Sequence, residues 1–143
     1  MTENIELQFL DTNILVYAFD TSTGRKYEIA DALVRQLWDN GAGCISLQVL
    51  QEFFVTITHK APQRMSVPEA REAIRNFSTW TVHRPEVDDV LAAIDIQQRF
   101  QISFWDALVI RAAQLTGCSI LWSEDLANGQ DYGGVVVKNP FLA

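Results

Sequence analysis

Residues 8–19 read QFLDTNILVYAF and combine two patterns that decide the fold. The run before Asp11 is short and apolar, as in a buried strand, while Asp11, Thr12 and Asn13 supply the polar residues that open a helix. A strand that leads directly into a helix is typical of a sheet covered by helices. Asp11 lies at this junction, which is where a parallel α/β sheet gathers its functional groups.

The same alternation of strand and helix continues along the chain. Apolar runs predict strands at 5–10, 44–46, 79–82, 119–122 and 135–137. Helical periodicity and capping residues predict helices at 11–19, 25–40, 46–60, 66–77, 85–100 and 103–116, followed by a polar loop at 123–134. The continuously apolar strand cores indicate an α/β fold of three layers, α/β/α, around a central parallel sheet of about four to five short strands.

Length and composition limit the possible classes of protein. The 143 residues contain no linker or repeat, so a single domain over 1–143 is expected. No apolar stretch approaches the ~18 residues that a membrane span requires. Residues 2–6 (TENIE) do not form a basic region followed by an apolar run, which predicts an unprocessed, cytoplasmic protein. Cys44 and Cys118 lie far apart in apolar runs, as buried, reduced cysteines do.

The net charge of −7 argues against a protein that coats nucleic acid non-specifically, because such proteins are normally basic. It does not exclude a nuclease, since a bound cation neutralises the acids of a metal site. The chain also has no zinc-binding motif, catalytic triad or glycine-rich phosphate loop. Carboxylates remain as the groups that could carry chemistry.

Four acidic residues stand out because each lies within or beside a separate apolar segment. They are Asp11 in QFLDTNILVYAF, Glu52 in VLQEFF, Asp106 in SFWDALVI and Asp125 in ILWSEDLANG. If they converge at one edge of the sheet, they form an all-oxygen cage of the kind that Mg²⁺ or Mn²⁺ prefers. Such a cage suits metal-assisted hydrolysis of a phosphodiester.

Two of these acids could instead have purely structural roles at helix starts. Asp11 could only cap its helix, although a carboxylate beside a buried strand is costly unless it is paired or metal-bound. Ser103 and Asp106 form an S-x-x-D arrangement close to a capping box, so Asp106 could only satisfy its own helix terminus. We expect Phe104 and Trp105 to pack inward and hold that turn rigid.

The other acidic residues have ordinary explanations too. Glu52 falls away from the apolar face of its helix, which favours a solvated side chain. Asp125 could be a turn residue, and the adjacent Glu124 competes with it for any role. We interpret the remaining aspartates as loop or surface charges: Asp20, Asp88, Asp89, Asp95 and Asp131.

Four segments together resemble the PIN-domain family, and within it the VapC-type ribonuclease toxins of bacterial toxin–antitoxin pairs. They are FLDTNILVYAFD (9–20), SLQVLQEFF (46–54), ISFWDALVIRAA (102–113) and ILWSEDLANGQDYGGVVVKNPF (120–141). The order and spacing of the segments also match, so the resemblance covers nearly the whole chain.

The resemblance implies a set of site residues. It makes the four acids of the active site Asp11, Glu52, Asp106 and Asp125, with Asp11 and Asp106 as the surest metal contacts. It implies small polar groups beside the metal or the scissile phosphate at Thr12, Asn13 and Ser123. It also implies a homodimer and a small cognate antitoxin whose C-terminal segment covers or enters the active-site groove.

The expected function is therefore a metal-dependent endoribonuclease, using one or two Mg²⁺ or Mn²⁺ ions, that acts as the toxin of a toxin–antitoxin module. Its substrate would be an RNA such as tRNA or rRNA, cut to leave a 3′-hydroxyl and a 5′-phosphate. Basic residues in two loops are candidate RNA contacts: Arg25, Lys26 and Arg64.

Two alternatives compete with this interpretation. One is a catalytically inactive RNA- or protein-binding module on a nuclease-like fold, which would have no reason to keep all four acids. The other is a phosphoaspartyl domain of the receiver or haloacid-dehalogenase type. Haloacid-dehalogenase-like chemistry needs a second aspartate two residues after the nucleophile, where this chain has Asn13.

Overall fold

The computed structural model describes residues 5–142. Residues 2–4, on which the prediction of an unprocessed N-terminus depends, lie outside this range. No helix within it is long and apolar enough to cross a membrane.

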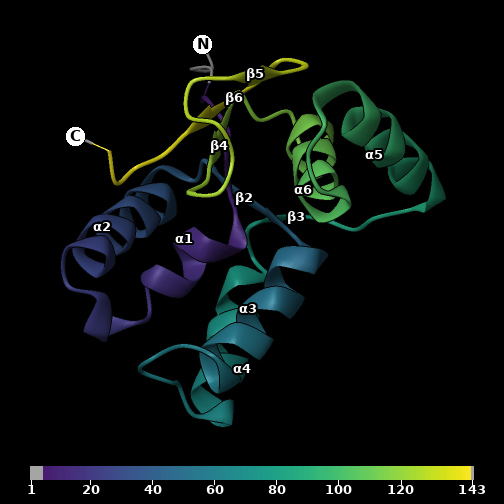
Figure 1. Ribbon diagram of the computed structural model, residues 1–143. Coiled ribbons are helices and arrows are strands. Elements are labelled where there is room, and N and C mark those ends of the chain that lie inside the picture. The colour runs from purple at the N-terminus through teal and green to yellow at the C-terminus, as the bar shows by residue number, and fades with distance from the viewer. Residues whose placement is uncertain (1–4, 143) are drawn as a thin grey trace.

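Six strands form one sheet in the order β3-β2-β1-β4-β6-β5 (Figure 1). The strands are β1 (Gln8–Leu10), β2 (Gly43–Ser46), β3 (Thr81–His83), β4 (Ile120–Trp122), β5 (Asp131–Tyr132) and β6 (Val135–Lys138). All neighbouring pairs are parallel except β5 with β6. The prediction of a largely parallel sheet is confirmed, and each of the five predicted strands is present.

Strand β5 is the addition to the predicted sheet, because it lies inside the segment predicted as a loop. Its two residues are too few to display a strand pattern. Gly133 and Gly134 form the turn between β5 and β6, with φ of 64° and 99°. Two glycines with positive φ are the usual connection of a tight hairpin, so this pair was the available signal.

The helices follow the predicted order. They are α1 (Thr12–Tyr17), α2 (Arg25–Asn40), α3 (Leu47–His59), α4 (Val67–Phe77), α5 (Val87–Phe100) and α6 (Phe104–Leu115), with a short 3₁₀ helix, η1 (Thr21–Thr23). The side chains of Ser46, Ser66 and Ser103 each accept a hydrogen bond from the first turn of the helix that follows. Gly41, with φ of 70°, ends α2.

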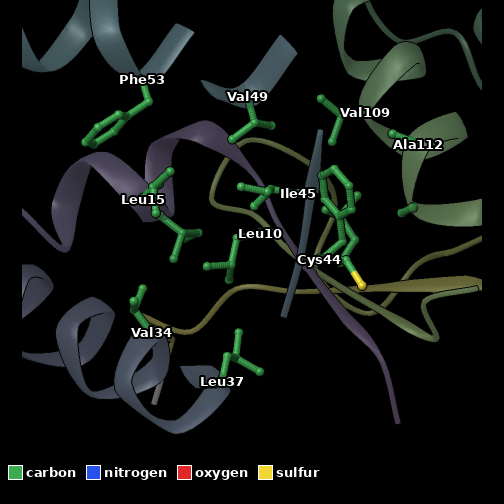
Figure 2. Packing of buried hydrophobic residues seen from close by; sticks show 14 of the residues in the cluster. Leu10, Leu15, Val34, Leu37, Cys44, Ile45, Val49, Phe53, Val109 and Ala112 are labelled. Atoms are coloured by element: carbon green, nitrogen blue, oxygen red, sulfur yellow. The ribbon is translucent and has the colours of Figure 1, made fainter. Parts of the chain in front are cut away.

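Helices cover both faces of the sheet. Consecutive strand residues point to opposite faces, so each central strand contributes to two apolar layers. Leu10 of β1 packs toward Val34 and Leu37 of α2, whereas Cys44 of β2 lies toward Val109 of α6, and all five are buried (Figure 2). The three-layer prediction is confirmed by this arrangement.

Two aspartates that we interpreted as loop or surface charges are buried, and that interpretation is wrong. Asp20 is 1% exposed and caps η1. Asp89, 5% exposed, accepts hydrogen bonds from Arg111 Nε (3.0 Å) and the Glu86 N–H (2.8 Å) and lies 3.1 Å from His83 Nε2. The partners of Asp89 come from β3, α6 and the N-terminus of α5, so the sequence around Asp89 gives no sign of its burial.

The strand order places a crevice at the carboxyl ends of β1 and β4. After β1 the chain moves to β2 on one side, whereas after β4 it moves to β5 and then β6 on the other. The connections that leave these two neighbouring strands therefore diverge. Such a switch point is where open α/β sheets bind their ligands, and α1 and α3 both begin at this edge (Figure 1).

Candidate active site

Asp11 is fixed at the switch point by three hydrogen bonds. Its N–H donates to the carbonyl of Trp122 at 3.0 Å, which extends the pairing of β1 with β4 by one residue. Its Oδ1 accepts from the N–H of Thr12 at 2.7 Å, and its Oδ2 accepts from the Ser123 hydroxyl at 2.8 Å. With a residue exposure of 5%, the carboxylate is held in one orientation.

The acids of the site perturb one another. Burial raises the pKa of Asp11 to about 7; the hydrogen bond from Ser123 opposes this, and the charges of Asp106 and Asp125 add to it. Burial also raises the pKa of Asp106, and the charge of Asp125 contributes in the same direction. Asp106 of α6 and Asp125 of the segment after β4 are therefore close enough to Asp11 to disfavour its charge.

All four predicted acids line one pocket of about 820 Å³. Asp11 and Asp106 lie in it together with Glu52 of α3 and with Asp125. Thr12 Oγ1 donates to Glu52 Oε1 at 2.8 Å, so the first turn of α1 is bonded to the middle of α3. The sequence allowed Glu52 to be an ordinary solvated residue on the exposed face of its helix, but its side chain lines this pocket.

Asn13 connects α1 to the segment that follows β4. Its Nδ2 donates to Asp125 Oδ2 at 3.0 Å, and its Oδ1 accepts from the N–H of Glu124 at 3.3 Å. Ser123 contributes here too, since its Oγ accepts from the N–H of Asp125 at 3.2 Å. The three predicted small polar residues thus each hold one of the acids.

Glu124 is turned away toward α1 and α2. It accepts a hydrogen bond from the Tyr17 hydroxyl at 2.8 Å and forms an ion pair with Lys26. We call these three residues, Glu124, Tyr17 and Lys26, the Glu124 anchor. Of the two adjacent acids that competed for one role, Asp125 lines the pocket and Glu124 belongs to the anchor.

The three basic residues suggested as RNA contacts do not gather at the pocket. Lys26 is engaged in the Glu124 anchor. Arg25 donates from Nη1 to the carbonyl of Phe141 at 3.1 Å, and Arg64 is exposed in the turn before α4.

The four acidic side chains are of the chemical type that binds a hard cation. They offer only carboxylate oxygens, which suit Mg²⁺ or Mn²⁺, and the raised pKa of Asp11 marks a buried carboxylate without a cationic partner. Within residues 5–142, however, no three acidic, histidine or cysteine side chains are close enough to hold one ion together. Hydrogen bonds to Thr12 and Asn13 hold the carboxylates of Glu52 and Asp125.

Comparison with known protein families assigns this fold. The family model described as the PIN domain matches residues 9–127, which is most of the chain. The chain belongs to the PIN domain family. No curated protein matches it in sequence.

Three solved structures illustrate the similarity of fold to this PIN domain. A toxin–antitoxin complex from Klebsiella pneumoniae is 21% identical, with 94% of this chain and 98% of that chain covered and a TM-score of 0.66. Mycobacterium tuberculosis VapC20, described as a Sarcin-Ricin loop cleaving toxin, is 17% identical, with 82% and 89% covered and a TM-score of 0.61. VapBC2 from Rickettsia felis, bound to a DNA fragment from its promoter, is 16% identical, with 93% and 98% covered and a TM-score of 0.65.

The PIN domain pocket is also lined by polar and aromatic residues that the sequence analysis did not assign to the site, including Gln48, Gln51, Lys60 and Trp105. Gln48 and Gln51 precede Glu52 on α3 by four residues and by one residue. Their closeness to Glu52 along this helix was the signal that could have placed them at the pocket. The prediction that Trp105 packs inward is wrong, since it is 63% exposed. It lies in the first turn of α6, which begins at the pocket.

Proposed function

We propose that residues 1–143 form a single nuclease domain, a metal-dependent endoribonuclease of the VapC type that acts as the toxin of a toxin–antitoxin module. The observation that carries the proposal is the convergence of Asp11, Glu52, Asp106 and Asp125 on one pocket. These acids come from four separate segments, and structural roles alone would not require them to share a cavity. The fold similarity to VapC20, a toxin that cleaves the Sarcin-Ricin loop, supports the same reaction class.

Asp11 and Asp106 would hold Mg²⁺ or Mn²⁺, assisted by Glu52 and Asp125. A divalent cation supplies Lewis acidity toward the phosphodiester and lowers the pKa of a bound water. Asp11 is suited to this role because its hydrogen bonds to Ser123 and Thr12 fix the carboxylate before any ligand arrives.

The remaining carboxylates would handle the proton. Glu52, held by Thr12, or Asp125, held by Asn13, orients the attacking water or accepts its proton. In-line attack then breaks the phosphodiester and leaves a 3′-hydroxyl and a 5′-phosphate, with tRNA and rRNA as the substrates to test.

The partners proposed with this function are a small cognate antitoxin and a second copy of the chain. The structures from Klebsiella pneumoniae and Rickettsia felis are toxin–antitoxin assemblies of similar fold, which supports an antitoxin as partner. Measurement of the mass of the purified chain in solution would check the homodimer: a monomer at micromolar concentration would contradict it.

The test is cleavage of a mixed tRNA and rRNA pool by protein freed of any co-purifying partner, with Mg²⁺ or Mn²⁺ and with EDTA. Discrete fragments are expected only with metal. Asp11→Asn should remove them, whereas Asp95→Asn, an exposed aspartate on α5, should not. Fragments that persist in EDTA would contradict the metal requirement.

A second candidate is a binding module that has no catalytic activity. It is favoured by the finding that no three potential ligands among residues 5–142 are close enough to share an ion. Mn²⁺ distinguishes the two, because a ligand that binds only the folded state raises its melting temperature. A metal-binding nuclease should show this rise, and a binding module should not.

The Glu124 anchor yields a prediction about activity. Glu124→Ala removes both bonds of the anchor and loosens the segment that carries Asp125. We expect a loss of activity of roughly 10-fold or more, which is typical when supporting groups around a metal site are removed. Single-turnover cleavage rates measure it, and Glu28→Ala, an exposed glutamate in the first turn of α2, is the control.

The cost in stability should be small, because Lys26 and Glu124 are partly exposed, at 42% and 25% of their side chains. Glu124→Gln, which keeps the bond from Tyr17, should recover part of the lost rate. Equal rates in Glu124→Ala and the unchanged protein would show that the anchor does not position Asp125.

A further inference from the structure

The pocket is a groove that follows one face of α3. Its lining residues on this helix are Gln48, Gln51, Glu52, Val55 and Thr56, and the lining continues to Lys60 at the C-cap. The spacing of three, four, seven and eight residues is that of a single helix face. From Gln48 to Lys60 the groove extends over about 18 Å, at the rise of a helical residue.

An exposed aromatic ring stands at one end of this groove. Trp105 lines the pocket, and Gln48 Nε2 lies 3.4 Å from its backbone carbonyl, so the ring is beside the first turn of α3. Trp38 and Trp80, in contrast, contact each other edge to face, with ring centroids 5.1 Å apart. Trp105 contacts only the edge of its neighbour Phe104 among aromatic rings of the described residues. An indole with 63% of its residue surface exposed has free area for a ligand.

A positive charge stands at the other end. Lys60 is exposed, and within residues 5–142 it is the one basic residue that lines the pocket. Glu52 lies between the two ends, eight residues before Lys60 and near the acids contributed by the other elements. The order along the groove is therefore aromatic ring, carboxylates, ammonium group.

We propose that this groove binds an unpaired stretch of RNA, with one base stacked on Trp105 and one backbone phosphate at Lys60. The scissile phosphate then lies between them, at the carboxylates. This inference rests on the proposed nuclease function and assigns its substrate-binding residues.

The size and the lining of the groove favour unpaired RNA as its ligand. An unstacked base binds an aromatic face, whereas a base inside a duplex has no free face to offer. A cavity of about 820 Å³ has the size of a pocket for one small ligand, which suits a few nucleotides and not a double helix. Because the acids repel phosphates until a cation neutralises them, stacking and Lys60 supply the attraction that the acids do not.

The experiment measures binding and cleavage separately. A fluorescently labelled, unstructured RNA oligonucleotide is titrated with protein in Ca²⁺, its anisotropy is recorded, and a gel confirms that it remains intact. Trp105→Ala should raise the Kd by roughly 5- to 150-fold, which corresponds to the loss of one stacked base. Trp105→Phe should restore most of the affinity. Leu115→Ala removes another exposed apolar side chain, at 51% exposure, from the far end of α6 and should change nothing.

The same variants show whether Trp105 contacts the substrate or only supports the structure. In Mg²⁺, Trp105→Ala should raise KM for RNA while kcat and the melting temperature stay close to those of the unchanged protein. Unaltered Kd and KM in Trp105→Ala would overturn the stacking site and leave the nuclease intact. A change in oligomeric state on substitution would overturn it as well, because the ring would then belong to a protein interface. Failure of the unchanged protein to bind any RNA would overturn both proposals.

The proposed contact of Lys60 with a phosphate is tested by the salt dependence of RNA binding. Each phosphate contact on a single strand contributes about 0.7 to the slope of log Kd against log salt. Lys60→Ala should reduce the slope by about that amount, and Arg71→Ala, at an exposed position on α4, should not. An unchanged slope in Lys60→Ala would overturn its assignment to a phosphate.

Discussion

Asp11→Asn is expected to abolish RNA cleavage and, in metal-free solution, to raise the melting temperature at pH 8 by roughly 10 °C. The two effects have one cause. Asp11 is buried beside Asp106 and Asp125, so its charge opposes folding unless a cation balances it. Asparagine removes that charge and replaces one of the two carboxylate oxygens that we propose bind the metal.

The sign of the pH dependence follows from the raised pKa. Asp11 has a pKa of about 7 in the folded protein and an ordinary value of 3.8. Between these values the folded state retains a proton that the unfolded state has lost, so stability falls as the pH rises from about 4 to 7. The shift from 3.8 to about 7, at 1.4 kcal/mol per pKa unit, corresponds to roughly 4 to 5 kcal/mol.

Thermal unfolding in EDTA at pH 5 and pH 8 measures this effect. The advantage of Asp11→Asn over the unchanged protein should be large at pH 8 and small at pH 5. Asp95→Asn controls for the loss of one exposed negative charge. Mn²⁺ should raise the melting temperature of the unchanged protein and not that of Asp11→Asn. An equal advantage at both pH values would contradict the buried charge as its source.

Asp89→Ala should lower the free energy of unfolding by roughly 3 kcal/mol, the low end of the range for breaking a buried ion pair. Asp89 joins α5 to α6 through Arg111 and joins both to the end of β3 through His83. Its removal leaves the Arg111 guanidinium, 25% exposed, without its carboxylate. Urea unfolding measures the loss. Asp88→Ala controls for the loss of an acid from the first turn of α5, because Asp88 is an exposed neighbour.

This contribution depends on pH in the opposite direction to that of Asp11. Burial raises the pKa of Asp89, but hydrogen bonds from the Glu86 N–H and Arg111, with the charge of His83, more than offset it and leave the pKa below its ordinary value. A lowered pKa stabilises the fold above the unfolded-state value and ceases to do so as the pH falls through the folded-state value. The difference between Asp89→Ala and the unchanged protein should therefore shrink below about pH 4.

Local sequence signals predicted most of the fold. The end of α2 at Gly41 and the start of α4 after Ser66 agree with the predicted helix bounds, because capping is decided within one turn. The central strands were recognisable because they are buried on both faces and therefore apolar throughout. Strand β5 was not predicted, since two residues carry no period.

The convergence of the four acids on one pocket was predicted, but the residues that surround them were not. Asp11 and Asp106 follow from their positions at element ends, which sequence reveals. The roles of Glu124 and Lys26 depend on how α2 packs beside the segment after β4, which only the folded chain defines. The exposure of Trp105 has the same origin, because it depends on where α6 begins relative to the pocket.

The position of β4 in the sheet has a consequence for synthesis of the protein. This strand lies between β1 and β6, so the middle of the sheet cannot be completed until residues 120–122 have been synthesised. A nascent chain that has reached only Thr116 already carries three of the four acids, but Asp11 has neither its hydrogen bond from Ser123 nor Asp125 beside it. A growing polypeptide of this topology therefore lacks the complete proposed site until the segment after β4 has been made and has folded against β1.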